Sequence, residues 1–194
     1  MNDFSLARKI TEIIPKTHGF FIGNSIPVRA VDSFGSSKGN DIPTALNRGA
    51  SGIDGIIASA CGYSSGLNRA VTVVIGDITA FHDLNSFKLL ADSEKPIFLI
   101  IINNHGGGIF SLLPIAKHTK IFEDFFGTPH KLDFKNIAKT FSLNYFNPKS
   151  INDFEIEYNK AVIKNNSAVI EIFTERSKIK EKIDEINKKL TKLI

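Results

Sequence analysis

The 194-residue chain is 42% hydrophobic and 23% charged, the balance of a soluble globular protein, and its length predicts one domain over residues 1–194. Its net charge of +4 is spread along the sequence, and no basic block with interleaved aromatic residues is present, which argues against nucleic-acid binding. No apolar run approaches the length of a membrane span and the N-terminal stretch lacks a signal-peptide core, so we expect no membrane span and a cytoplasmic location.

Apolar periodicity and turn residues predict helices that alternate with strands along the chain. The first half is predicted to contain a helix at residues 4–14, a strand at 19–23, a short helix at 27–34, a polar loop at 35–47 around one short strand, a glycine-rich turn at 47–52, and a helix at 53–61. The second half is predicted to contain strands at 71–75, 97–102, 144–146 and 168–173, helices at 83–91, 134–141, 151–164 and 178–193, and a mobile loop with one short helix at 114–129.

The strands at 71–75 and 97–102 show no polar alternation, as expected when helices cover both faces of a sheet. Regular alternation of strands and helices predicts a three-layer α/β/α fold with a mostly parallel sheet of about six strands and right-handed crossovers. In such sheets, ligands bind at the carboxyl ends of the strands. The residues that follow each strand are therefore the first candidates for a site.

The single cysteine, Cys61, excludes an intramolecular disulfide, which fits a reducing cytosol. It follows Ile53, Ile56, Ile57 and Ala60 at helical spacing. This pattern favours a buried structural thiol over a nucleophile.

Small polar residues end two of the predicted strands. Gly76-Asp77 ends the first, and Asn103-Asn104-His105-Gly106 ends the second. A carboxylate, an amide oxygen and a glycine carbonyl are enough for a Mg²⁺ ion that takes its other ligands from phosphate and water. The pattern thus predicts a metal site at Asp77, Asn104 and Gly106 that holds a diphosphate. The alternative is that Asp77 only caps the helix that follows it.

The spacing of these residues carries a resemblance. Gly76-Asp77, then 26 residues, then Asn104 resembles the cofactor motif of thiamine-diphosphate-dependent enzymes. Four stretches in the same order resemble the branch of that family that acts in menaquinone biosynthesis: GNSIPVR, NRGASGIDG, GDITAFHDLN and NNHGGGIFSLLP. Ile78 stands where most family members have a further glycine, a departure that this branch shares. The resemblance runs from about residue 4 to residue 173.

The resemblance implies a role for each matching residue. Asp77, Asn104 and the Gly106 carbonyl would bind Mg²⁺, or Mn²⁺ in its place. Ile53 would hold thiamine diphosphate in its bent shape. The full set of implied cofactor contacts is Asn24, Ser25, Gly52, Ile53, Gly76, Asp77, Thr79, Ala80, Asn104, Gly106 and Ile109.

The resemblance also implies substrate contacts. Arg29 and Arg48 would bind substrate carboxylates, for which a planar guanidinium is well suited. Ile109, Phe110 and Leu113 would form an apolar wall beside the reacting carbon. The implied substrates are 2-oxoglutarate, which loses CO₂, and isochorismate, to which the succinyl carbanion adds in a 1,4 fashion.

In this family the cofactor binds between two domains of different subunits, and the pyrimidine-binding domain supplies an activating glutamate. The chain resembles only the diphosphate-binding domain, and Glu12 and Glu94 lie in no matching motif. We therefore expect no catalytic residue in this chain and no turnover by the chain alone. The implied partners are a pyrimidine-binding domain, from another chain or a missing segment, and further copies in a homo-oligomer.

Other interpretations depend on weaker patterns. Residues 62–66, GYSSG, match the serine-hydrolase motif with Ser64 as nucleophile, but the match follows a predicted helix and precedes a strand, the reverse of the required order. Heptad-like apolar residues in 178–193 leave open a non-catalytic remnant or assembly module. The five histidines form no zinc pattern, no G-x-G-x-x-G follows a strand, and His105 receives no catalytic role.

Overall fold

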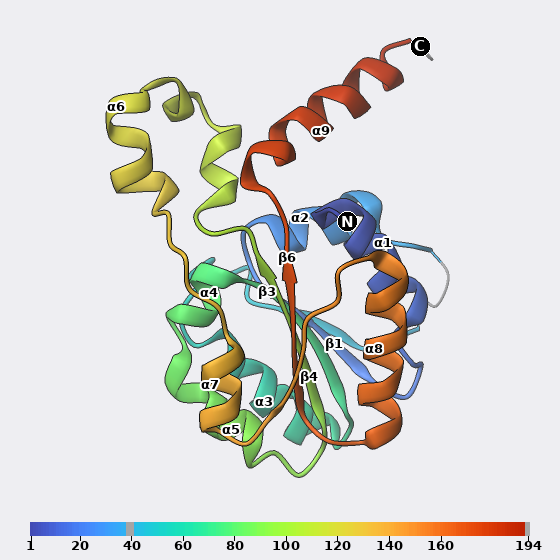
Figure 1. The fold of residues 1–194 in the computed structure, drawn as a ribbon. Helices are drawn as coiled ribbons and strands as arrows, with labels where there is room; N and C mark the ends of the chain where they lie inside the picture. Colours follow the sequence, from blue (N-terminus) through green and yellow to red (C-terminus); the bar gives the residue numbers. More distant parts are fainter. Residues whose placement is uncertain (38–40, 193–194) are drawn as a thin grey trace.

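The computed structural model describes residues 1–37 and 41–192. Within these residues six strands form one sheet in the order β2-β1-β3-β4-β6-β5, and every pairing is parallel. Helices cover both faces of the sheet (Figure 1), which confirms the predicted three-layer α/β architecture. The strands are β1 (Gly19–Ile22), β2 (Thr44–Leu46), β3 (Val71–Gly76), β4 (Ile97–Asn103), β5 (Asn144–Phe146) and β6 (Ala168–Phe173).

One face of the sheet packs against helices α3 (Ile56–Leu67), α5 (Phe87–Ala91) and α7 (Lys135–Thr140). The other face packs against α1 (Asp3–Ile13) and α8 (Ile151–Lys164). Alternate strand residues point to opposite faces. In β3, for example, Val73 and Ile75 join the first core while Val74 joins the second, so apolar side chains of this strand are buried on both faces.

A third apolar cluster lies beyond the carboxyl ends of the strands, between α2 (Ile26–Phe34) and α9 (Arg176–Leu190). Ile179 of α9 is only 2% exposed, and Ile183 and Ile186 pack beside it. The apolar residues in the first turns of α9 therefore pack against other parts of this chain. The predicted closing helix ended at Leu193, which lies outside the described residues, as do residues 38–40 of the predicted loop at 35–47.

Residues 108–127 form an arm that projects from the sheet edge beside α9 (Figure 1). The arm consists of short helical turns: η2 (Gly108–Leu112), η3 (Pro114–Lys117), α6 (Thr119–Phe122) and the π-turn η4 (Glu123–Gly127). It carries large exposed apolar side chains, with Phe125 at 74% exposure. None of the helices in residues 1–37 and 41–192 combines the length and apolar character needed to cross a bilayer.

Two predicted helices differ from the structure by more than the one to three residues seen at the ends of the others. The helix expected at 53–61 begins at Ile56, because Gly55 has a positive φ of 67°, and continues to Leu67. The helix expected at 83–91 is divided into the short helix η1 (Leu84–Ser86) and α5. The side chain of Asp83 lies before η1, and its Oδ2 accepts the backbone N–H of Ile57 at 2.6 Å, so that it caps α3 from a distance.

The topology places a switch point between β1 and β3. These neighbours connect outward in opposite directions, β1 to β2 and β3 to β4. Connections that diverge in this way leave a crevice at the carboxyl ends of the two strands. The polar residues after β1, β3 and β4 all lie at this edge.

Candidate functional site

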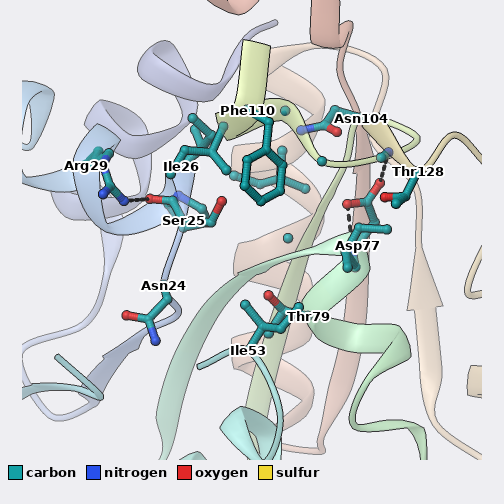
Figure 2. A pocket seen from close by; sticks show the side chains of 18 of the residues that line it. Asn24, Ser25, Ile26, Arg29, Ile53, Asp77, Thr79, Asn104, Phe110 and Thr128 are labelled. Carbon is teal, nitrogen blue, oxygen red and sulfur yellow. Dashed lines mark hydrogen bonds between the residues drawn. The ribbon is translucent and has the colours of Figure 1, made fainter. Parts of the chain in front are cut away.

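A cavity of about 350 Å³ opens at the carboxyl ends of β1, β3 and β4. In Figure 2, Asp77, Thr128 and Asn104 lie on one side, Asn24, Ser25 and Arg29 lie on the other, and Phe110 stands between them. The cavity brings together most of the residues singled out from the sequence. Those that line it are Asn24, Ser25, Arg29, Arg48, Ile53, Gly76, Asp77, Thr79, Asn104, Gly106, Ile109 and Phe110.

Three predicted site residues do not line the cavity. Gly52 lies just behind it, where its carbonyl accepts a hydrogen bond from Asn24 Nδ2 at 2.6 Å. Ala80, a residue of α4 (Asp77–Phe81), is fully buried in the core. Leu113 lies on the arm, 48% exposed to solvent.

Asp77 begins α4 directly after β3 and is 2% exposed. Its Oδ1 accepts the Ile78 N–H at 2.8 Å, and its Oδ2 accepts the Gly106 N–H and His130 Nε2, both at 3.0 Å. Capping of α4 does not account for these contacts, because the N-cap of α4 is Gly76 and Asp77 is the first residue of the helix. Burial raises the pKa of the Asp77 carboxyl above its ordinary value, while the hydrogen bonds from Ile78 and Gly106 and the nearby His130 offset part of this shift.

Asn104 and Gly106 follow β4 in an unusual backbone conformation. His105 between them has a φ of +60°, which non-glycine residues rarely adopt, and Gly106 has a φ of +149°. Asn104 is 9% exposed, and its buried Oδ1 has no hydrogen-bond partner within the described residues. A buried amide oxygen without a partner costs free energy unless a ligand satisfies it.

The donor set near Asp77 suits a hard cation. An ionised carboxylate offers about four lone-pair sites, and the structure uses three of those on Asp77. Asn104 adds a free amide oxygen, and Gly106 adds a carbonyl that accepts the Gly108 N–H at 3.0 Å and keeps a second lone pair. Because the described residues contain no cluster of three or more His, Cys, Asp or Glu side chains placed for a metal, any ion here would need these oxygens together with phosphate or water.

The opposite side of the cavity carries positive charge. Arg29 donates to the Ser25 carbonyl at 2.8 Å, and Arg48 donates to Asn24 Oδ1 at 3.2 Å. A guanidinium has five N–H groups, so each arginine keeps donors for an anionic ligand. Ser25, which connects β1 to α2, has a positive φ of 72° and faces the same space.

No sequence pattern indicated several residues of this region. His130 contacts Asp77 although it lies between the loop predicted at 114–129 and the helix predicted at 134–141, where no element was expected. Asp3 lines the cavity from the start of α1 and is 2% exposed, and burial raises its pKa. Phe125, Phe126 and Thr128 of the arm and its end also line the cavity. All of these approach from distant parts of the chain, which local patterns do not report.

The structure rules out a nucleophile elbow at Ser64. This residue is fully buried within α3, and its Oγ donates to the Arg69 carbonyl at 2.8 Å. A hydrolase nucleophile needs a sharp strand-to-helix turn and an exposed Oγ. Cys61 is buried in the same helix, as expected, and burial raises the pKa of its thiol to about 11.

Residues 36–172 match the family model described as thiamine pyrophosphate enzyme, C-terminal TPP binding domain. The chain belongs to this family. Two solved structures share its fold: a thiamine diphosphate-dependent 4-hydroxybenzoylformate decarboxylase from Rhodococcus jostii (TM-score 0.72, 19% identity, 90% of this chain and 33% of that one) and a benzoylformate decarboxylase from Polynucleobacter necessarius (TM-score 0.67, 17% identity, 89% and 33%).

Closer relatives in sequence carry the name 2-succinyl-5-enolpyruvyl-6-hydroxy-3-cyclohexene-1-carboxylate synthase. The protein from Prosthecochloris aestuarii is 45% identical over 91% of this chain and 31% of its own length. The protein from Rubrobacter xylanophilus is 41% identical over 91% and 30%, and that from Chlorobium phaeobacteroides 41% identical over 100% and 34%. The chain thus spans about a third of the length of these relatives.

Proposed function

We propose that this chain is the part of a 2-succinyl-5-enolpyruvyl-6-hydroxy-3-cyclohexene-1-carboxylate synthase that grips the diphosphate of thiamine diphosphate through Mg²⁺. One observation carries the proposal: Asp77 and the partnerless Oδ1 of Asn104 lie on the same side of one cavity, at the ends of neighbouring strands. The sequence identity of 41–45% to synthases of that name supports it.

In this proposal Asp77, Asn104 and the Gly106 carbonyl bind the cation, with Mn²⁺ able to replace Mg²⁺. Gly76, Thr79 and Ala80 lie along the diphosphate at the start of α4. Ile53 supports the bent cofactor, and Asn24, Ser25, Gly52 and Ile109 complete its surroundings.

The bound cofactor supplies an electron sink for decarboxylation of a 2-oxoacid and for the addition that follows. The residues of this chain then serve to bind and orient substrate. Arg29 and Arg48 pair with the carboxylates of 2-oxoglutarate and isochorismate, and Phe110, with Ile109 and Leu113, provides an apolar wall. The reaction belongs to menaquinone biosynthesis.

The proposal includes partners. The glutamate that activates the cofactor belongs to a pyrimidine-binding domain, and the relatives have about two thirds of their length outside the region that this chain matches. The cavity is completed by that domain from another subunit, so the working unit contains at least two copies of the diphosphate-binding part. The chain alone is not expected to turn over.

The test is reconstitution with a pyrimidine-binding partner. Turnover of 2-oxoglutarate and isochorismate is measured with thiamine diphosphate and Mg²⁺, for the chain alone, for the partner alone and for the mixture. The proposal predicts activity only in the mixture, lost when Asp77→Ala replaces the parent chain. Robust turnover by the chain alone, or full activity with Asp77→Ala, contradicts it.

A further inference from the structure

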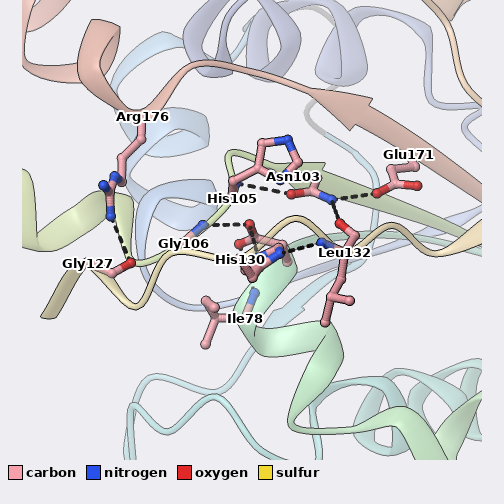
Figure 3. A network of polar contacts seen from close by, with 10 residues as sticks. Ile78, Asn103, His105, Gly106, Gly127, His130, Leu132, Glu171 and Arg176 are labelled. Atoms are coloured by element: carbon pink, nitrogen blue, oxygen red, sulfur yellow. Dashed lines mark hydrogen bonds and ion pairs between the residues drawn. The ribbon is translucent and has the colours of Figure 1, made fainter. Parts of the chain in front are cut away.

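Polar contacts link Asp77, through His130, Leu132 and Asn103, to a buried carboxylate in β6. Figure 3 shows this network from His130 to Glu171. Glu171 is fully buried and accepts three hydrogen bonds. The donors are Asn103 Nδ2 at 2.6 Å, Tyr145 Oη at 2.6 Å and the Phe134 N–H at 3.0 Å. A buried carboxylate needs such partners, because desolvation without them is costly. Glu171 therefore holds two groups in place: the side chain of Asn103 at the end of β4, and the backbone of Phe134 directly before α7.

The side chain of Asn103 also binds two loops, one that contains His105 and one that contains Leu132. Its Nδ2 also donates to the Leu132 carbonyl at 3.0 Å, and its Oδ1 accepts the His105 N–H at 3.1 Å. A backbone hydrogen bond from the His130 N–H to the His105 carbonyl, at 3.4 Å, joins the same loops directly. The segment that carries His130 is thus held against the segment that carries Asn104 and Gly106.

Hydrogen bonds also give the imidazole of His130 a defined orientation. The Leu132 N–H donates to its Nδ1 at 3.3 Å, so Nδ1 is the acceptor and the neutral ring carries its proton on Nε2. That Nε2–H donates to Asp77 Oδ2 at 3.0 Å. The ring packs edge-on against Phe81, with centroids 4.9 Å apart, and against His105 at 5.5 Å. The side chain is only 12% exposed.

We propose that His130 is a positioning residue of the metal site, whose Nε2–H fixes the carboxylate of Asp77. The inference rests on the proposed function. His130 and the Gly106 N–H both bind Oδ2, which leaves the free lone-pair site on Oδ1. A hydrogen bond from a histidine to a metal-binding carboxylate restricts its rotation, and removal of such outer partners lowers metal affinity roughly 10–100-fold. His130 touches neither cofactor nor substrate in this account.

The first test measures Mn²⁺ binding by the full chain in the presence of thiamine diphosphate, using the paramagnetic effect of bound Mn²⁺ on water. His130→Leu removes the donor, whereas His130→Gln keeps an N–H near the position of Nε2. His118→Leu is the matched control, because His118 is exposed on the arm and does not line the cavity. Asp77→Ala reports the metal site itself.

We expect about 10–100-fold weaker Mn²⁺ binding for His130→Leu, recovery to within about threefold of the parent for His130→Gln, and no change for His118→Leu. If His130→Leu binds Mn²⁺ like the parent while Asp77→Ala does not, the positioning role is wrong and the proposed function stands. If His130→Gln binds as weakly as His130→Leu, the donor role is wrong. A parent chain that binds no Mn²⁺ with the cofactor overturns both proposals.

The second test needs no metal. Two-bond ¹⁵N–¹H correlations of the histidine rings in the metal-free chain, at about pH 8 where free imidazole is neutral, identify which nitrogen of His130 carries the proton. The His130→Gln variant assigns the signal. The inference predicts the Nε2–H form. A ring protonated on Nδ1 contradicts it, because Nε2 could not then donate to Asp77.

Discussion

Gly106 lies so close to Gly127 that a Cβ added to Gly106 would stand 2.2 Å from the Gly127 carbonyl oxygen. The φ of Gly106, +149°, is also one that other residues rarely adopt. The loop that carries Asn104 and the end of the arm therefore meet backbone to backbone, and only glycine fits between them.

Gly106→Ala is expected to lower the free energy of unfolding by at least about 2 kcal/mol, because the new methyl group must displace either the arm or the loop that carries Asn104. Gly62→Ala is the matched control. Gly62 lies inside α3 with nothing within 4 Å of an added Cβ, so this change is expected to stabilise the chain by about 0.5–1 kcal/mol. Urea denaturation measures both. Equal stability of Gly106→Ala and the parent contradicts the close approach.

Glu171→Leu tests the buried network behind the site. The leucine leaves the Phe134 N–H, one N–H of Asn103 Nδ2 and Tyr145 Oη without their acceptor, while Asn103 keeps its hydrogen bond to the Leu132 carbonyl. Each buried group left unpaired costs about 1–3 kcal/mol. We expect a loss of stability on the order of 3 kcal/mol or more. Tyr145→Phe removes one donor and leaves the other two, so its expected loss is about 1 kcal/mol. Denaturant unfolding in which Glu171→Leu costs no more than Tyr145→Phe would contradict the central place of Glu171.

His18 is expected to make the fold sensitive to mild acid. It is buried against Phe98, where burial lowers the pKa of its imidazole to about 4. Between that value and the ordinary value of about 6.5, the unfolded chain binds a proton that the folded chain does not, so stability falls as the pH falls through this range.

The measurement is the free energy of unfolding at several pH values between about 4 and 7.5. His18→Leu should reduce the slope with pH by up to about 1.4 kcal/mol per pH unit, whereas His118→Leu, at an exposed position, should leave it unchanged. An identical slope for His18→Leu and the parent would show that His18 titrates normally in the folded chain.

Much of the fold was predictable from local patterns. The bounds expected for β5, α8 and β6 coincide with those in the structure. In α8 the reasons are local: the Ser150 side chain accepts the Asp153 N–H, and Asn165 ends the helix in the left-handed conformation. The apolar strands β3 and β4 were equally clear, because helices cover both of their faces.

The remaining features depend on contacts between distant residues. Asp83 caps α3 through Ile57, 26 residues earlier in the chain. His130 reaches Asp77 across 53 residues, and Glu171 reaches Asn103 across 68. No periodicity or turn signal encodes such pairs. The candidate site could be predicted at the strand ends, where motif residues are contiguous, while the side chains that orient it could not.

Isothermal titration calorimetry of thiamine diphosphate binding, with and without Mg²⁺, tests whether Asp77 holds a metal ion for a diphosphate. Asp92→Ala is the matched control, because Asp92 is exposed and pairs only with Lys88 among the described residues. We expect the parent and Asp92→Ala to bind thiamine diphosphate only when Mg²⁺ is present, and Asp77→Ala to lose this binding. If Asp77→Ala bound Mg²⁺ and thiamine diphosphate as tightly as the parent, Asp77 would not be a ligand of the ion.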